Sequence, residues 1–320
     1  GQYVHTLGGA ESPFSDVVQT VMPCVVGVSN RGNSFNIISG QTELVEQATG
    51  SGVVVTTQGH VVTNYHVIEG ASDVQVLSQG RYLKTEIVGY DELTDLAVLR
   101  VREDIELPAV KMGDMSDVRV GDWAIVIGNP LGKQFADTVT VGVVSALNRE
   151  LESSSIVKML QTDAAINSGN SGGALVDAEG KLIGINTLIM STSGTSSGVG
   201  FAIPVDYAFG IAEQLIQGKT PSHAQLGVSL ITVNNELAQR FGIQATEGAY
   251  INSLTAGGAA AKAGLQEGDV ILKVDGESIT SSSDLVLAIR SHSPNDEVDV
   301  TYLRDGKEET TKVKLGADTQ

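Results

Sequence analysis

The sequence predicts a mainly β protein, in which a β-barrel or β-sandwich region of about 200 residues precedes a smaller α+β domain of about 100 residues. Three observations support this prediction. Short β-branched or alternating runs follow one another closely through the first part of the chain. Glycine accounts for 37 of the 320 residues without a collagen-like period, which is typical of many tight turns. Beyond residue 220, strand patterns begin to alternate with short helical ones.

The first part of the chain contains ten expected strands and few helices. Each strand run is bounded by Gly, Asn, Asp or Pro, and the runs lie at 25–29, 52–56, 61–63, 74–77, 96–101, 123–127, 139–146, 174–176, 182–186 and 199–202. Helical patterns are expected at 13–21, opened by Ser12, and at 205–217, which Gly218 stops. We therefore expect an N-terminal segment over 1–12 and one domain over 13–220.

The last hundred residues, 221–320, form the second expected domain. Its predicted strands lie at 226–232, 249–251, 270–274, 297–303 and 309–315, and its predicted helices at 235–241, 259–263 and 283–290. The dipeptide Asp305-Gly306 between the last two strands is a strong hairpin signal.

Composition excludes several classes of protein. Hydrophobic residues make up 41% of the chain, which excludes wholesale disorder, and the formal net charge of −18 would repel phosphate backbones and anionic lipid headgroups. We therefore expect no nucleic-acid partner. The single cysteine, Cys24, stands beside two valines and is expected to be a buried apolar residue rather than a reactive thiol. No apolar run approaches the length of about 18 residues that spans a bilayer.

Two stretches have no clear periodicity. Residues 30–49 are predicted to form a polar loop, and residues 190–198 form a run rich in Ser, Thr and Gly. Loops of this length inside compact domains are often functional, so both are candidate switch loops. Simple surface excursions are the alternative interpretation.

A serine between glycines is the first candidate for chemistry. Ser171 stands in Gly169-Asn170-Ser171-Gly172-Gly173, directly before a predicted strand. Flanking glycines let the backbone turn tightly, uncover the hydroxyl and direct successive N–H groups toward one point, as an oxyanion requires. A plain Gly/Ser turn remains the alternative.

A serine nucleophile needs a histidine base that a carboxylate orients. Of five histidines, His66 stands at the end of an apolar strand, although a structural core histidine is the alternative there. Asp95 immediately precedes an apolar strand, where a buried acid needs a partner, whereas Asp91 and Glu92 are more typical of a turn. The order His66, Asp95, Ser171 is that of chymotrypsin rather than of the α/β-hydrolases or subtilisins. We expect activity to rise with pH as the imidazole of His66 loses its proton.

At this point the sequence resembles the HtrA/Deg family of serine proteases. The resemblance runs from about residue 14 to 315 and depends on five motifs in family order: TNYHV at 63–67, TDLAVL at 94–99, GNPLG at 128–132, QTDAAIN leading into GNSGG at 161–173, and GFAIP at 200–204. It implies a chymotrypsin-like double β-barrel followed by one PDZ domain.

The resemblance also implies roles for individual residues. His66 would be the general base, Asp95 its orienting acid and Ser171 the nucleophile. The backbone N–H groups of Gly169 and Ser171 would form the oxyanion hole, in a loop that Asn170 completes. The wall of the primary specificity pocket would consist of Ile166, Thr187, Leu188 and Ile189. Such an aliphatic lining favours small apolar residues before the cleaved bond, because a basic side chain would be buried unpaired.

Regulatory residues are implied as well. Arg149 matches the family's sensor-loop arginine, with a solvated loop charge as the alternative. Leu226, Gly227 and Val228 resemble the loop of PDZ domains that binds a peptide's C-terminal carboxylate, although Leu226 and Val228 could be ordinary strand residues. The expected partners are unfolded or misfolded proteins and C-terminal peptides.

The family also sets expectations for assembly and location. A homotrimer packed through the N-terminal segment is expected, because a single PDZ domain and a rather short 30–49 loop argue against a larger cage. Ser168 stands where some members carry Arg or Pro, which says little about chemistry. An extracytoplasmic location is expected, in the bacterial periplasm or cell envelope, and a membrane anchor upstream of Gly1 is compatible with the sequence.

The resemblance therefore implies an ATP-independent serine endopeptidase that cleaves misfolded or regulatory proteins, in protein quality control and stress response. One alternative is a peptide-binding, chaperone-like holdase with a mostly inactive protease domain, and another is a PDZ scaffold. No metal-ligand cluster or phosphate-binding glycine loop appears in the sequence, so no metal or cofactor is expected. The physiological substrate and the activating peptide are not encoded in any recognisable pattern.

Overall fold

A computed structural model describes residues 12–130, 138–149, 157–188 and 198–318 of the chain. These residues form two compact units. The first contains the described residues up to 149 and from 159 to 220, and the second contains 157–158 and everything described after 220. No helix among the described residues combines the length and apolar character needed to cross a membrane.

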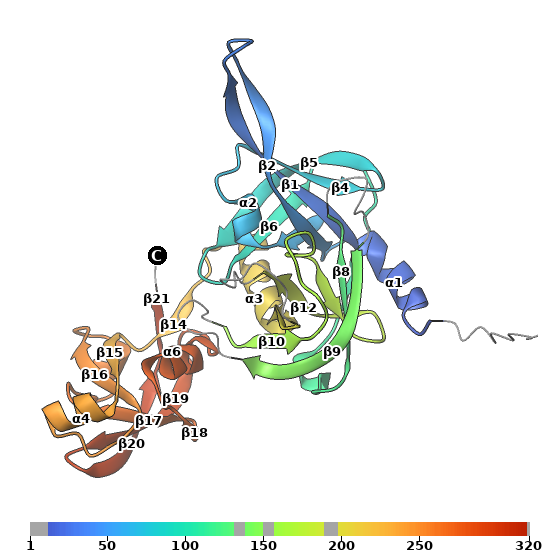
Figure 1. Cartoon of the computed structure of the whole chain (residues 1–320). Coiled ribbons are helices and arrows are strands. Elements are labelled where there is room, and N and C mark those ends of the chain that lie inside the picture. Colours follow the sequence, from blue (N-terminus) through green and yellow to red (C-terminus); the bar gives the residue numbers. More distant parts are fainter. Residues whose placement is uncertain (1–11, 131–137, 150–156, 189–197, 319–320) are drawn as a thin grey trace, which may run out of the picture. The chain divides into compact units, whose positions relative to one another are not determined.

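The first unit begins with a closed antiparallel barrel (Figure 1). Its strands follow the order β1-β2-β3-β6-β5-β4 and comprise β1 (Val25–Asn36), β2 (Gln41–Val54), β3 (His60–Thr63), β4 (Asp73–Ser78), β5 (Arg81–Asp91) and β6 (Leu96–Val101). Valine and leucine side chains that alternate along these strands fill the barrel, among them Val26, Val54, Val61, Leu83 and Leu99. The short helix α2 (Tyr65–Ile68) follows β3 and packs over one end of this core.

Residues 30–49 form a long hairpin instead of the predicted loop. Strands β1 and β2 stay paired from the barrel out to Asn36 and Gln41, with one register shift between Asn30 and Arg31, and Figure 1 shows the hairpin projecting from the barrel. At its tip the N–H of Gly40 donates to the carbonyl of Asn36 at 2.8 Å. In a two-stranded ladder, the inward-facing backbone groups pair with each other and the outward-facing ones bond to water, so polar residues can form it without a buried face.

A second barrel completes the first unit. It contains six strands: β8 (Trp123–Gly128), β9 (Thr138–Arg149), β10 (Met159–Thr162), β11 (Ala174–Val176), β12 (Lys181–Thr187) and β13 (Gly200–Pro204). They close in the order β11-β8-β9-β10-β13-β12. A short strand, β7 (Lys111–Met112), pairs with β12 in parallel. The predicted run at 190–198 lies almost wholly outside the described residues.

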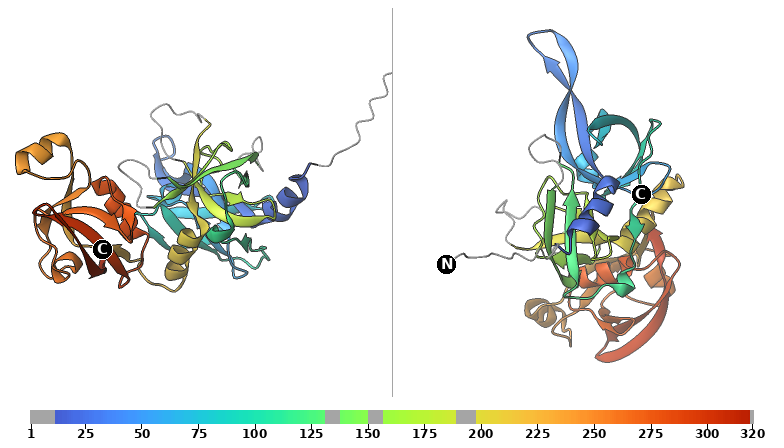
Figure 2. Two further views of the ribbon diagram at one scale, coloured as in Figure 1. Left: turned by 90° about the horizontal axis from the view of Figure 1, so that it is seen from below. Right: turned by 90° about the vertical axis from the view of Figure 1, so that its right-hand side faces the viewer.

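Helices tie the two barrels together. Helix α1 (Ser15–Val21) and a 3-10 turn (Met22–Cys24) lead into β1, and Figure 2 shows this helix next to strands of the second barrel. Phe14, directly before α1, makes an edge-to-face contact with Trp123 of that barrel. Helix α3 (Val205–Ile216) follows β13 and lies over β5 and β6 of the first barrel. Gly89 of β5 leaves room for Leu215, because a Cβ at Gly89 would lie 2.9 Å from a Leu215 methyl group.

The second unit is an α+β domain. Its strands are β14 (His223–Gln225), β15 (Val228–Thr232), β16 (Ala249–Leu254), β17 (Val270–Val274), β18 (Glu277–Ser278), β19 (Glu297–Arg304), β20 (Lys307–Lys314) and β21 (Gly316–Asp318). The main sheet has the order β15-β16-β17-β19-β20, and β18 pairs with β17. Strands β14 and β21 form a separate pair. Helices α4 (Asn235–Phe241), α5 (Ala259–Lys262) and α6 (Ser282–Arg290) accompany it. Asp305 and Gly306 have φ values of 50° and 73°, as a hairpin turn of the predicted kind requires.

One buried ion pair stabilises the second unit. The carboxylate of Asp269 is 1% exposed and accepts two bonds from the Arg304 guanidinium, at 2.8 and 2.7 Å. This pairing raises the pKa of Arg304 above its ordinary value. The pair joins the start of β17 to the end of β19.

Candidate active site

The three predicted triad residues come together where the two barrels meet. His66 lies on α2 directly after β3, and Asp95 precedes β6, so the first barrel supplies both. Ser171 lies in the loop before β11 of the second barrel. His66 Nδ1 and Asp95 Oδ2 are 2.7 Å apart, and His66 Nε2 lies 3.4 Å from Ser171 Oγ.

The carboxylate of Asp95 is held in place by the residue that it orients. Its Oδ1 accepts a bond from the backbone N–H of His66 at 2.8 Å, and its Oδ2 faces the imidazole Nδ1. Asp95 has a φ of 56°, in the left-handed region that Asp tolerates better than most residues. Its carbonyl accepts bonds from the Tyr65 N–H at 3.0 Å and the Asn64 side chain at 3.1 Å. The carboxylate and the carbonyl of one residue thus both bind the helix start that carries His66.

Gly172 makes the nucleophile loop possible. Gly172 has a φ of 82°, and a Cβ there would collide with the carbonyl oxygen of Ser51. The Gly172 N–H donates to the carbonyl of Asn186 at 2.7 Å, while the Ser51 N–H donates to the carbonyl of Ser171 at 2.9 Å. The loop therefore packs directly on backbone atoms of the first barrel, which only glycine permits.

The hydroxyl of Ser171 has three polar neighbours. It donates to Asn64 Oδ1 at 2.8 Å, accepts from the Leu188 N–H at 3.2 Å and lies at the longer distance of 3.4 Å from His66. Asn64 was not among the residues predicted from the sequence. Its position two residues before His66, in the same motif, is the only signal that could have pointed to it.

The N–H groups assigned to the oxyanion hole are occupied in this structure. The Gly169 N–H donates to Asn167 Oδ1 at 2.9 Å, and the Ser171 N–H donates to the Asn167 carbonyl at 3.1 Å. Asn170 is fully buried, and its side chain bonds the Asn167 N–H and the Ala165 carbonyl. Oxyanion binding would require the 167–171 turn to release both donors, so the assignment stays a prediction.

The residues predicted to line the specificity pocket lie beside the nucleophile loop. Ile166 and Thr187 are buried and Leu188 is half-buried, whereas Ile189 lies outside the described residues. Gly200, at the start of β13, packs against Ile166, since a Cβ at Gly200 would lie 2.9 Å from an Ile166 methyl group. A glycine at that position keeps the space beside Ile166 open, which sequence patterns alone did not indicate.

Two other titratable side chains of the first unit have raised pKa values. The Tyr65 hydroxyl donates to Glu92 at 3.0 Å, and this bond raises the pKa of Tyr65 to about 12. Burial raises the pKa of the Cys24 thiol above its ordinary value, in keeping with the predicted apolar role. Among the described residues, no group of three or more His, Cys, Asp or Glu side chains is arranged to hold a metal ion.

Arg149 ends β9 and is exposed. Its Nε donates to the side-chain oxygen of Gln161 on β10 at 2.8 Å, so in this structure it pairs with a neighbouring strand of its own barrel. Its predicted regulatory role stays a prediction.

The predicted carboxylate-binding loop lies in the second unit, just before β15. Leu226 is buried, and its carbonyl accepts from the Ala260 N–H at 2.9 Å. Gly227 has a φ of 73°, and its carbonyl accepts from the Thr255 N–H at 2.9 Å. Val228 is half-buried and begins β15. The loop is thus fixed through the carbonyl groups of Leu226 and Gly227, and the binding of a carboxylate by its N–H groups stays a prediction.

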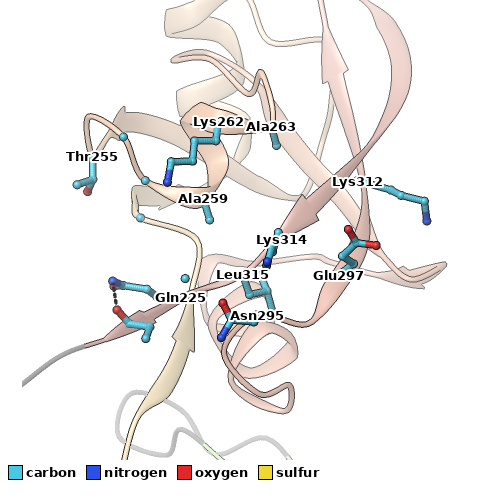
Figure 3. A pocket seen from close by; sticks show the side chains of 15 residues that line it. Gln225, Thr255, Ala259, Lys262, Ala263, Asn295, Glu297, Lys312, Lys314 and Leu315 are labelled. Atoms are coloured by element: carbon cyan, nitrogen blue, oxygen red, sulfur yellow. Dashed lines mark hydrogen bonds between the residues drawn. The ribbon is translucent and has the colours of Figure 1, made fainter.

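A hollow of about 570 Å³ adjoins this loop (Figure 3). Thr255 and Lys262 lie on one side of it in the view, and Gln225 and Asn295 lie on the other. The side chain of Gln225 donates to the Ala317 carbonyl at 2.8 Å, which ties the loop to β21. The residues of α6 do not contribute to this hollow.

A double barrel with a Ser-His-Asp constellation, followed by a small sheet domain, defines a trypsin-like serine peptidase with an accessory domain. Comparison with known proteins agrees: residues 50–185 match the trypsin-like peptidase domain family, and residues 224–315 match the PDZ domain family. The chain belongs to the HtrA/DegP family of serine endoproteases.

Individual relatives support this assignment. A probable periplasmic serine endoprotease DegP-like protein of Halomonas elongata is 44% identical over 84% of this chain and 56% of its own length. A protein of the same description from Marinomonas sp. is 39% identical over 95% of this chain and 71% of its own length. The solved HtrA-type protease AlgW with a decapeptide matches with a TM-score of 0.78 and 33% identity, covering 96% of this chain and 99% of that one. The chain thus spans little more than half the length of the Halomonas relative.

Proposed function

We propose that this protein is an ATP-independent serine endopeptidase in which His66, Asp95 and Ser171 form the catalytic triad. The observation that carries the proposal is the position of the His66 ring, which faces the Asp95 carboxylate at 2.7 Å and the Ser171 hydroxyl at 3.4 Å.

The reaction follows from these atoms. Ser171 Oγ attacks the scissile carbonyl carbon, and its proton passes to His66 Nε2 while Asp95 stabilises the resulting imidazolium. The C–N bond then breaks, and the same proton leaves with the amine. Water repeats these steps on the acyl-enzyme, with His66 again as base, and frees the carboxylic acid. The N–H groups of Gly169 and Ser171 are the proposed oxyanion donors once they leave Asn167.

The specificity that we propose follows from the lining of the pocket. Ile166, Thr187 and Leu188 present aliphatic surface and one hydroxyl beside the nucleophile. Ile189, which lies outside the described residues, is the fourth proposed member of this lining. A small aliphatic side chain before the cleaved bond can be buried there without leaving a charge unpaired. We propose unfolded or misfolded proteins as substrates, because exposed aliphatic residues are abundant in them.

The second unit is proposed to bind C-terminal peptides at Leu226, Gly227 and Val228. The bound peptide would add a strand beside β15. AlgW, a relative of this chain, has been solved with a decapeptide and with a tripeptide. Binding there is proposed to promote release of the oxyanion donors through Arg149. The described relatives also support an extracytoplasmic, periplasmic location for this chain, while a homotrimer and an upstream membrane anchor are proposed on family resemblance alone.

Degradation of casein tests the proposal. We expect the purified protein to degrade casein, with activity rising on addition of a matching C-terminal peptide, and Ser171→Ala to lower the rate by about 10⁴-fold or more. Arg149→Ala is expected to reduce activation by the peptide while leaving peptide affinity unchanged. A protein that suppresses aggregation equally well with and without Ser171, and that a fluorophosphonate never labels, would instead be a holdase.

A further inference from the structure

Asn64 is a fully buried polar residue next to the proposed triad. It occupies the position before α2, where Asn side chains often accept a bond from the first turn of a helix. Here the side chain makes no such bond and is 0% exposed. A buried amide that gives up its capping partner must satisfy its polar atoms elsewhere, because leaving them unpaired is costly.

Three bonds fix the orientation of the Asn64 amide. Its Nδ2 donates to the Asp95 carbonyl at 3.1 Å and to Thr187 Oγ1 at 3.2 Å. Both neighbours are on the same side, and a carbonyl can only accept, so the amide nitrogen must face Asp95. The side-chain oxygen therefore faces Ser171 and accepts its hydroxyl hydrogen at 2.8 Å.

A serine hydroxyl carries one hydrogen, so Asn64 and His66 compete for it. The hydrogen bond to Asn64 Oδ1 is 2.8 Å, whereas the distance to His66 Nε2 is 3.4 Å, beyond the usual range. We propose that Asn64 is a positioning residue that holds the hydroxyl of Ser171 away from its base in the resting enzyme. The inference rests on the proposed triad and assigns the step that precedes attack: transfer of this hydrogen bond from Asn64 to His66.

The other partners of Asn64 have further bonds. The Asp95 carbonyl also accepts from the Tyr65 N–H at 3.0 Å, and the Asp95 carboxylate is held by His66. Thr187 Oγ1 also lies within bonding distance of the Ile185 carbonyl, at 3.5 Å. Only the Ser171 hydroxyl would lose its short acceptor if the Asn64 side chain were replaced. The holding role can thus be separated from general support of the site.

The decisive experiment measures how fast Ser171 reacts with diisopropyl fluorophosphate, a small probe that makes little use of the specificity pocket. Asn64→Leu replaces the amide with an apolar side chain of similar size. The hydroxyl then has His66 as its remaining acceptor, and we expect the second-order rate constant to rise about fivefold, the value of one neutral hydrogen bond. Asn64→Ala should act in the same direction and serves if the leucine variant folds poorly.

Asn30→Leu is the matched control. Asn30 is also a buried asparagine, 1% exposed, and its Nδ2 bonds the carbonyls of Val67 and Glu69 at 3.1 and 2.9 Å. It therefore supports the same short helix without touching Ser171. We expect this variant to lose stability like Asn64→Leu but to show no increase in labelling rate.

A proton NMR readout reports on the hydrogen bond itself. The low-field resonance of the His66 Nδ1 proton should shift in Asn64→Leu, because Nε2 gains a donor, and should stay unchanged in Asn30→Leu. An equal or lower labelling rate in both Asn64 variants would overturn the inference and leave the triad intact. If diisopropyl fluorophosphate labelled the wild-type protein nowhere, or labelled Ser171→Ala equally, the proposed function itself would fail.

Discussion

The proposed protease site depends on side chains, whereas the proposed peptide-binding site depends on backbone groups. In the protease unit, hydrogen bonds connect the side chains of Ser171, Asn64, Asp95 and His66, with the backbone carbonyl of Asp95 as the link to Asn64. In the PDZ unit, the loop at Gly227 is held through backbone carbonyls, and its proposed ligand contacts are backbone N–H groups. Chemistry depends on which atoms carry a proton, so it requires particular side chains, whereas recognition of a carboxylate requires only correctly placed donors.

This difference predicts unequal tolerance to small changes of shape. Gly172 and Gly227 both adopt positive φ, at 82° and 73°. The space around them differs, because a Cβ at Gly172 would collide with the backbone carbonyl of Ser51, whereas one at Gly227 would meet its nearest atoms at 3.4 Å. The same substitution at the two glycines therefore tests the comparison directly.

Gly172→Ala should have the largest effect. The backbone of the nucleophile loop must move away from Ser51, which displaces Ser171 from His66, and a misplacement of about 1 Å can cost about 100-fold in rate. We expect casein degradation to fall by about that factor, with peptide binding at the PDZ unit unchanged in fluorescence anisotropy. Gly210→Ala is a suitable control, because a Cβ at this helical glycine meets nothing within 4 Å. Activity near the wild-type value in Gly172→Ala would show that the loop has more freedom than its contacts imply.

Gly227→Ala should have a smaller effect and a different one. The added methyl group fits in ordinary contact, and the left-handed conformation costs about 1–2 kcal/mol for an L-residue. We expect affinity for a C-terminal peptide to fall about tenfold by isothermal titration, while unstimulated casein degradation stays the same. If affinity were unchanged, the proposed contacts of this loop with the peptide carboxylate would be wrong.

The sequence predicted which residues form the site better than it predicted their hydrogen bonds. His66, Asp95 and Ser171 could be recognised because each stands in a short motif beside a strand, and strand ends determine where such residues meet. The bonds of Asn167 and Asn64 could not be predicted, since they depend on which side-chain rotamers and loop turns compete for the same N–H and O–H groups. Local pattern identifies the residues, and the competition among polar groups becomes visible only in three dimensions.

The fold shows the same division. Strands with buried valines and leucines, such as β3 and β6, were predicted from their apolar runs. Strand β5 was missed because many of its residues are exposed, and the 30–49 hairpin because it has no apolar face. Strand β5 is held by backbone pairing with β6, and the two strands of the hairpin are held by pairing with each other. In both of these elements, the sequence lacks the apolar pattern that marks a buried strand.

The smallest predicted effect concerns acid sensitivity of the first barrel. His60 begins β3, is 9% exposed and has its Nδ1 2.7 Å from Thr56 Oγ1. Burial, aided by the charges of Arg100 and Arg102, lowers the pKa of His60 below its ordinary value. The unfolded chain therefore binds a proton there at higher pH than the folded protein does. Stability is unaffected above about pH 6.5 and falls as the pH drops from there toward the lowered folded value.

His60→Gln should remove this part of the acid sensitivity. Glutamine keeps a polar side chain near Thr56 but does not titrate, so the loss of stability between pH 7 and pH 5 should be smaller than in the wild-type protein. The single tryptophan, Trp123, lies in the protease unit, so its fluorescence during urea unfolding follows that unit. His292→Gln, in the PDZ unit, is the control and should leave the tryptophan transition unchanged at both pH values. Equal acid sensitivity in His60→Gln and wild type would mean that carboxylates, rather than this histidine, govern the acid response of the barrel.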